Sequence, residues 1–343
     1  MKVKPKLMRN PWSLPNPKRR GGWPHWLLVV PGLLFFAAAA LASPPAHKEH
    51  HTQPETQAQH SPNEEKVQEG KLREEREEKD EFDRKIAIPV KPHRLICLAP
   101  SVTDMVYALG AGDDVVGISD YTKYPAEALK KPSVGQVLNP SVESIVALRP
   151  DLVLGIELST IETVRQLERL NIPVFLVQPH GIEGIYRSLK NLGRVLQREQ
   201  AADSLIARLR GREQAVRARI RGRAPLRIFL PLSENPVITI GRSSFISEII
   251  AAAGGKSVTD DLTQEWPSIS METVLARQPD YLLLIKDVPL TIDSLKKTPG
   301  WRDVKCVQQG RVFYVDDRIY YPSPLVFDAL ESLAAQFFPA EAQ

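Results

Sequence analysis

The stretch Glu143-Ser-Ile-Val-Ala-Leu-Arg-Pro-Asp-Leu-Val-Leu-Gly-Ile156 recurs 129 residues later as Glu272-Thr-Val-Leu-Ala-Arg-Gln-Pro-Asp-Tyr-Leu-Leu-Leu-Ile285. Six of the fourteen positions are identical. Each copy has the pattern of a short helix with a Glu in its first turn, a Pro-Asp break and a buried strand. The positive N-terminal end of a helix favours a Glu, but this effect does not explain why the same pattern occurs in both copies. The repeat predicts two lobes of related α/β design, each with a carboxylate at an equivalent place.

On both sides of these copies, from Ile86 onward, short β-branched runs alternate with amphipathic stretches. This alternation is typical of layered α/β folds. The expected strands are Arg94–Leu98, Val115–Ser119, Asp151–Gly155, Val174–Val177, Leu226–Pro231, Tyr281–Ile285 and Val312–Val315. The expected helices are Ser101–Leu109, Val142–Leu148, Thr160–Leu170, Ile182–Leu196, Glu199–Arg221, Ser244–Ala253, Met271–Ala276 and Leu325–Phe337.

The longest expected helix, Glu199–Arg221, contains no proline and has α/β segments on both sides. We interpret it as a rod that connects two lobes; the alternative is an ordinary surface helix of a single domain. The first interpretation divides the folded part into an N-terminal lobe (87–197), an interlobe helix (198–222) and a C-terminal lobe (223–338).

The first 86 residues differ in composition from the rest. Residues 1–42 combine seven basic side chains and no acidic one with an apolar run over residues 26–42. This pattern predicts a secretory signal peptide or, if it is not cleaved, a membrane anchor. Residues 43–86 are too polar to form a core and predict an unstructured linker, whose charged second half could form a solvated helix.

Charge and motif content argue against several classes of protein. The formal net charge is +4, but without residues 1–42 it becomes about −3, which does not support a nucleic-acid surface. The sequence contains no Walker loop, Gly-x-Ser-x-Gly elbow or His-Glu-x-x-His motif. Only His93 and His180 follow residue 86, too few for a multi-histidine zinc site. Cys97 and Cys306 fall in different lobes and are expected to be isolated, inert thiols. We therefore expect no catalytic residues, no metal site and no cofactor.

What remains is the chemistry of a concave ligand site. In two-lobed α/β proteins, ligands bind beyond the carboxyl ends of the strands. Four aromatic residues fall in the loops expected there, where they could grip a flat or large ligand: Tyr121, Trp266, Tyr320 and Tyr321.

Three segments and the repeat carry a family resemblance. The segments are Arg94-Leu-Ile-Cys-Leu-Ala-Pro-Ser-Val-Thr-Asp-Met-Val-Tyr-Ala-Leu-Gly110, Val116-Gly-Ile-Ser-Asp-Tyr-Thr-Lys-Tyr-Pro125 and Phe245-Ile-Ser-Glu-Ile-Ile-Ala-Ala-Ala-Gly-Gly255. Over about residues 93–338, the sequence resembles the periplasmic binding proteins that serve ABC importers of cobalamin and ferric siderophores.

The resemblance implies two Rossmann-like α/β lobes bridged by one long helix, the class III periplasmic-binding-protein fold. It further implies an exported, periplasmic and monomeric receptor that holds its ligand in an interlobe cleft. Glu143 and Glu272 match lobe-tip glutamates that dock on arginines of the ABC transporter permease dimer. The positions assigned to the ligand are Pro100, Ser101, Tyr121, Trp266, Arg318, Tyr320 and Tyr321.

The resemblance favours cobalamin as the ligand, with a ferric siderophore or haem as the alternative. Val137 and Ile156 replace tryptophans of the cobalamin binders, Asp104 replaces a glutamate, and Arg318 would also suit an anionic ligand. Two functions of other classes are an enzyme on a similar scaffold and a metal-sequestering protein that uses the His47–His60 tract. The enzyme would need a metal-carboxylate motif or an acid/base pair, and no local spacing supplies either.

Overall fold

The computed structural model describes residues 74–159, 161–286 and 288–339. The predicted signal segment (1–42) and the His47–His60 tract lie outside the described residues. Within the described ranges, no helix combines the length and the apolar character needed to cross a membrane.

A parallel sheet with the strand order β4-β3-β5-β6 is the centre of what we call the N-terminal lobe. Its strands have continuous apolar sequences because helices cover both faces of a parallel sheet. The strands are β3 (Leu95–Cys97), β4 (Val115–Ile118), β5 (Leu152–Ile156) and β6 (Val174–Val177). The helices of this lobe are α1 (Pro100–Ala108), α2 (Val142–Ala147), α3 (Ile161–Arg169) and α4 (Gly181–Val195), with 3-10 turns at Gly112–Asp114 and Ala128–Lys130.

A second parallel sheet, in the order β10-β7-β12-β13, is the centre of the C-terminal lobe. Its strands are β7 (Leu226–Phe229), β10 (Gly255–Ser257), β12 (Tyr281–Ile285) and β13 (Val312–Val315). Its helices are α6 (Phe245–Ala252), α7 (Met271–Arg277), α8 (Ile292–Leu295), α9 (Lys305–Gln308) and α10 (Val326–Phe337), with 3-10 turns at Trp301–Asp303 and Asp317–Tyr320. A small antiparallel sheet that the sequence did not predict joins β8 (Ser233–Glu234), β9 (Val237–Ile238) and β11 (Ser268–Ile269).

Each parallel sheet has its own apolar core. Ile96, Val153 and Val174 belong to the core of the N-terminal lobe, whereas Leu282 and the fully buried Trp301 belong to that of the C-terminal lobe. The two sheets with their helices confirm the predicted α/β fold.

Cys97 and Cys306 are both buried and free, as the sequence predicts. Burial raises the pKa of the Cys97 thiol to about 12 and that of Cys306 to about 11. Both side chains are therefore protonated and unreactive at neutral pH.

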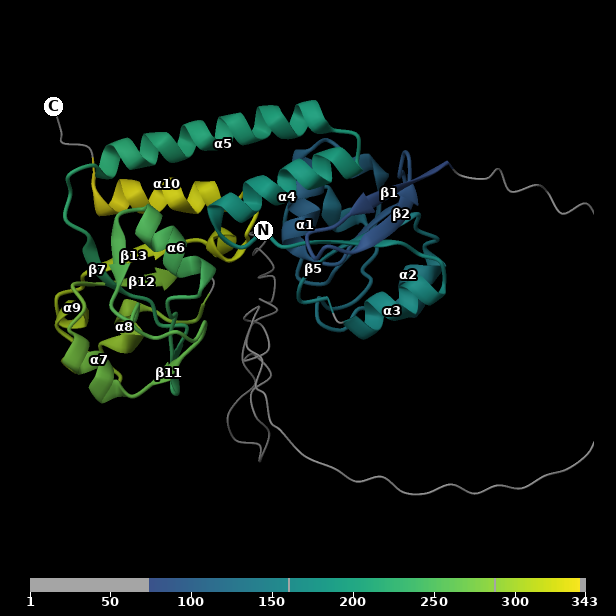
Figure 1. Cartoon of the computed structure of the whole chain (residues 1–343). Helices are drawn as coiled ribbons and strands as arrows, with labels where there is room; N and C mark the ends of the chain where they lie inside the picture. Colours follow the sequence, from purple (N-terminus) through teal and green to yellow (C-terminus); the bar gives the residue numbers. More distant parts are fainter. Residues whose placement is uncertain (1–73, 160, 287, 340–343) are drawn as a thin grey trace, which may run out of the picture. The chain divides into compact units, whose positions relative to one another are not determined.

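The long helix α5 (Glu199–Ile220) packs against α4 of one lobe and α10 of the other (Figure 1). Arg212, in its middle, donates hydrogen bonds to Asp328 at 2.6 Å and to Glu331 at 2.7 Å, both on α10. Helix α5 thus bridges elements of both lobes, as its length and flanks predict.

The segment before the N-terminal lobe departs from the prediction of an unstructured linker. Strands β1 (Glu75–Lys79) and β2 (Lys85–Pro89) pair as an antiparallel hairpin, so the second half of residues 43–86 is neither disordered nor helical from residue 75 onward. Arg84 donates to the Val174 carbonyl at 2.8 Å, and the Gln178 backbone N–H donates to Glu81 at 2.8 Å. Charged side chains of this segment, which suggest a solvated linker in the sequence, therefore form hydrogen bonds with residues at and just after strand β6 of the N-terminal lobe.

Candidate ligand-binding site

The loops that follow β4 and β13 contact each other across the two lobes. Each begins at the carboxyl end of a parallel strand, where ligands bind in open α/β sheets. Lys123 Nζ lies 2.5 Å from Asp317 Oδ2, and the Tyr124 hydroxyl donates to Asp317 Oδ1 at 3.1 Å. The Tyr124 ring meets the Tyr321 ring edge-on, with 5.9 Å between centroids. These contacts bring together two of the loops expected to line the cleft.

Asp317 is the centre of this contact. It is only 4% exposed, although it carries a carboxylate. Burial removes water from the charge, so the ammonium of Lys123 and the hydroxyl of Tyr124 replace part of its hydration. Neither Lys123 nor Asp317 was singled out in the sequence as a candidate.

The four predicted aromatic residues occupy three loops. Tyr121 is 44% exposed and has a φ of 66°, in the left-handed region that residues other than glycine rarely adopt. Tyr320 and Tyr321 are half-buried next to Asp317, and Trp266 is half-buried just before β11. Tyr121, Tyr320 and Tyr321 therefore lie on the two loops that Asp317 joins.

Arg318 has partners within the protein. Its guanidinium donates to Asp316 at 2.8 Å and to Asp328 at 2.6 Å, and these carboxylates raise its pKa further. A ligand anion would have to compete with these two carboxylates. Pro100 and Ser101 open α1, which starts beyond the carboxyl end of the central strand β3; Pro100 is half-buried and Ser101 is buried.

A second polar group, missed in the sequence, follows β5 and β6. Glu157 Oε2 lies 2.8 Å from His180 Nε2 and accepts a hydrogen bond from Gln178 at 3.1 Å. The hydrogen bonds from Gln178 and then His180 lower the pKa of Glu157. On the C-terminal lobe, burial raises the pKa of Glu265, next to Trp266, and the charges of His180 and Glu157 act on it as well. The signal that could have identified them is their position after apolar strands: Glu157 directly follows β5, and His180 is the third residue after β6.

Glu143 and Glu272 occupy equivalent places at the starts of α2 and α7. The Ser141 hydroxyl accepts a hydrogen bond from Ser144 N at 3.1 Å, and the Ser270 hydroxyl accepts one from Thr273 N at 3.2 Å. In both helices the Glu follows the capping Ser by two residues and is exposed. The Ser270 hydroxyl lowers the pKa of Glu272. Two exposed carboxylates are thus presented by helices that begin in the same way.

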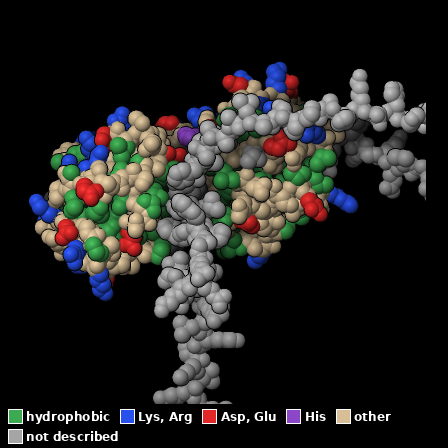
Figure 2. Space-filling model, turned by 90° about the horizontal axis from the view of Figure 1, so that it is seen from below, with side chains coloured by type: hydrophobic (Ala, Val, Ile, Leu, Met, Phe, Trp, Pro, Cys, Tyr) green, Lys and Arg blue, Asp and Glu red, His purple; other side chains and the backbone are tan. Residues whose placement is uncertain are grey.

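A pocket of about 230 Å³ lies elsewhere on the C-terminal lobe, at the edge strand β10. It is lined by Arg227, Arg242, Lys256, Ser257, Val258, Asp260 and Asp261. None of the predicted ligand residues lines this pocket. On the face shown in Figure 2, basic and acidic side chains are interspersed around apolar areas, in keeping with the near-neutral charge of the folded part.

The chain has the architecture of a two-lobed α/β binding protein. Helices cover its two parallel sheets, one long helix bridges the lobes, and loops from the strand ends of both lobes contact each other. Residues 95–319 match the family described as periplasmic binding protein, which is roughly two thirds of the sequence. The chain belongs to this family.

Relatives and solved structures agree with this assignment. The vitamin B12-binding protein of Vibrio cholerae is 27% identical over 261 residues, 75% of this chain and 94% of that protein. The crystal structure of the periplasmic vitamin B12-binding protein BtuF of Vibrio cholerae has a TM-score of 0.63 at 26% identity and covers 74% of this chain and 100% of that one. The periplasmic heme-binding protein RhuT from Roseiflexus sp. RS-1 has a TM-score of 0.66 at 27% identity, and the match covers 72% of this chain and 98% of that one. These similarities confirm the predicted family and fold.

Proposed function

We propose that the protein is an extracytoplasmic receptor that captures a corrinoid, cobalamin, between its lobes and delivers it to an ABC importer. The observation that carries this proposal is the contact between the β4 and β13 loops, which carry four tyrosines (Tyr121, Tyr124, Tyr320 and Tyr321) beyond the carboxyl ends of strands from both lobes. The similarity to vitamin B12-binding proteins supports the choice of ligand.

In this proposal the ligand is held mainly by aromatic surface. Tyr121 and Trp266 would pack against the flat corrin ring, since aromatic rings offer a large apolar face at small entropic cost. Tyr320 and Tyr321 would contact its side groups, and Pro100 and Ser101 would border the site at the start of α1. We assign no catalytic residue and no cofactor.

Glu143 and Glu272 would deliver the loaded receptor by docking on basic residues of the permease dimer. Their support is the matching capped helix starts of α2 and α7 and the exposure of both carboxylates. The receptor would act as a periplasmic monomer, either released after cleavage of its signal segment or tethered through residues 26–42.

A ferric siderophore or haem is the second candidate ligand. Phenol and imidazole groups bind ferric iron, and Tyr121, Tyr320 and His180 supply such groups near the strand ends. The similarity to the heme-binding protein of Roseiflexus also favours this alternative.

Equilibrium titration of the purified protein with cyanocobalamin, a ferric hydroxamate and haem tests the choice. Tryptophan fluorescence follows the first two ligands, and the Soret absorption band follows the third. Saturable binding of cyanocobalamin at one molecule per chain, with weaker binding of the others, supports the corrinoid proposal. Tighter binding of haem or of the ferric chelate would transfer the proposal to that ligand.

A further inference from the structure

The contact at Asp317 joins segments that are remote in the sequence. Lys123 and Tyr124 follow the outermost strand β4 of one sheet, and Asp317 follows the outermost strand β13 of the other. The Lys123 side chain is 40% exposed, whereas that of Asp317 is 6% exposed. Separation of the two loops would therefore leave Asp317 without either of these partners.

A second contact between the lobes lies at the start of α4. Glu248, on α6 of the C-terminal lobe, accepts a hydrogen bond from the backbone N–H of Ile182 at 3.0 Å. The negative charge of Glu248 also suits the positive end of helix α4. This contact is close to the bridge in which α5 packs on α4 and on α10. The Asp317 contact, by contrast, ties two loops at the strand ends.

We propose that Lys123, Tyr124 and Asp317 form an interlobe latch that keeps the lobes closed before ligand arrives and sets the spacing of the tyrosines on the two loops. Tyr121 lies two residues before Lys123, and Tyr320 lies three residues after Asp317. Lys123 and Asp317 are positioning residues in this account, because they act through the loops and not on the ligand.

The burial of the Asp317 carboxylate makes the latch sensitive to the loss of its cationic partner. A paired, desolvated carboxylate is tolerated, whereas the same carboxylate left alone in a buried place is strongly disfavoured. Removal of the Lys123 ammonium should therefore favour separation of the loops, because separation returns Asp317 to water. Exchange of the two charges should restore the closed arrangement.

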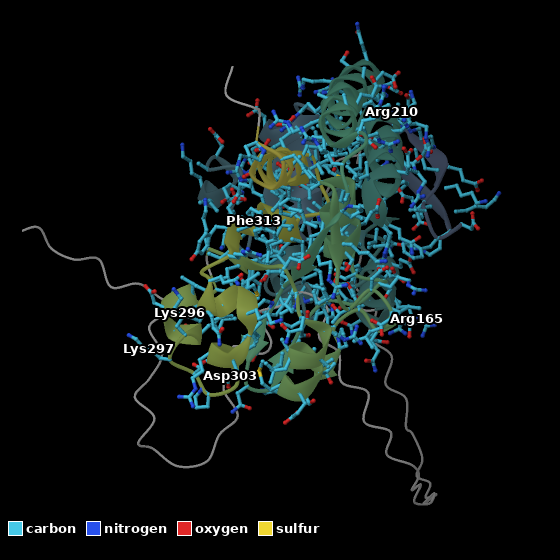
Figure 3. The ribbon with its side chains drawn as sticks, turned by 90° about the vertical axis from the view of Figure 1, so that its left-hand side faces the viewer. Arg165, Arg210, Lys296, Lys297, Asp303 and Phe313 are labelled. Atoms are coloured by element: carbon cyan, nitrogen blue, oxygen red, sulfur yellow. The ribbon has the colours of Figure 1, made fainter. Side chains whose placement is uncertain are left out.

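The lobe separation can be measured in the ligand-free protein by pulsed electron paramagnetic resonance. Spin labels at Arg165→Cys on α3 and Lys297→Cys after α8 report on one lobe each; both side chains are exposed, and Figure 3 shows them at the surface. Cys97 and Cys306 are buried, so they do not take up label.

With the latch intact, the label pair should give one narrow distance distribution. Lys123→Met and Asp317→Asn should each broaden it and shift it to longer distance, and the exchange Lys123→Asp with Asp317→Lys should return it toward the original. Lys85→Met removes an ion pair of 2.8 Å within the hairpin and is the matched control, with no expected change.

Unchanged distributions in Lys123→Met and Asp317→Asn would overturn the latch. A broadening that the charge exchange does not reverse would also overturn it, because the cause would then be local damage. Lys123→Met keeps the measurement informative even if the Asp317 variants do not fold, since its side chain is partly exposed. No ligand is present in this experiment, so its outcome is independent of the proposal that the protein binds a corrinoid.

Discussion

The hydroxyl of Tyr186 donates a hydrogen bond to Glu213 Oε2 at 2.9 Å, which links α4 to the bridging helix α5. Glu213 is 7% exposed and also pairs with Arg217. The Tyr186 ring stacks on Phe327 of α10 at 5.8 Å between centroids. Through this one tyrosine, α4 therefore contacts both of the other helices that join the lobes, α5 and α10.

Tyr186→Phe should destabilise the protein by about 1–2 kcal/mol, because the ring contacts remain while a buried carboxylate loses a donor. Urea unfolding followed by circular dichroism measures this change. Tyr281→Phe is the matched control, since its ring also stacks on a phenylalanine, Phe313, at 4.6 Å. Equal midpoints for wild type and Tyr186→Phe would show that the hydrogen bond to Glu213 contributes nothing.

Asp104 should make stability depend on pH in an unusual direction. Burial raises the pKa of Asp104 to about 6, although hydrogen bonds from Ser323 and Leu325 oppose the shift. An unfolded Asp has a pKa of about 3.9, so between about pH 4 and pH 6 the folded state binds more protons than the unfolded state. The contribution of Asp104 to stability therefore falls as the pH rises through this window.

Relative to Asp104→Asn, the wild type should lose roughly 1–3 kcal/mol of unfolding free energy between pH 4 and pH 6. Urea titrations at both pH values give the difference, and comparison of the two proteins cancels the titration of the other carboxylates. Asp113→Asn, at an exposed position, should retain the wild-type slope. Parallel pH profiles for wild type and Asp104→Asn would contradict the assignment.

The hairpin β1–β2 should be part of the folded unit. The Glu81 carboxylate accepts hydrogen bonds from Gln178 N at 2.8 Å, Ser188 at 3.1 Å and Asn191 at 3.1 Å. Glu81→Ala should therefore cost about 2–3 kcal/mol in urea unfolding, since hydrogen bonds to a charged group are the stronger ones. Glu77→Ala, in an exposed pair on the same hairpin, should change stability by less than about 1 kcal/mol. Similar small effects of both changes would mean that the hairpin is only loosely attached.

Glu143 and Glu272 should matter for transport and not for ligand affinity. The double variant Glu143→Gln with Glu272→Gln should bind ligand normally, yet transport should fall at least tenfold, because removing one partner of a charge pair that is buried and hydrogen-bonded in an interface typically costs about 2–5 kcal/mol. Uptake into proteoliposomes with the cognate permease measures this. The matched control is a second double variant, Glu162→Gln on α3 with Asp293→Asn on α8, which neutralises two other acidic residues in the first turns of helices. Wild-type uptake by the double variant would reject the docking role.

The sequence predicts those parts of the fold whose signals are local. The runs Leu152–Ile156, Val174–Val177 and Tyr281–Ile285 are apolar and β-branched or leucine-rich, and they form buried strands as expected. The hairpin could not be predicted because Glu75–Lys79 has the composition of a solvated segment. Its partners lie far away in the sequence: the Arg194 carbonyl that Arg76 contacts at 2.8 Å, for example, is 118 residues away.

The site shows the same limit. Loop aromatics such as Tyr121 and Tyr320 stand out in the sequence because they fall outside any core periodicity. Lys123 and Asp317 are ordinary charged loop residues until the fold joins them across 194 positions. Arg318 stands out as a free basic residue, yet Asp328, on the next helix, already holds it.

Isothermal titration of the wild type and Trp266→Ala with cyanocobalamin tests the proposed binding function most directly. We expect one molecule bound per wild-type chain and at least tenfold weaker binding by Trp266→Ala, about 1.4 kcal/mol, with an unchanged unfolding temperature. Absence of binding to the wild type would contradict the corrinoid proposal. Equal affinity of the two proteins would remove Trp266 from the binding surface.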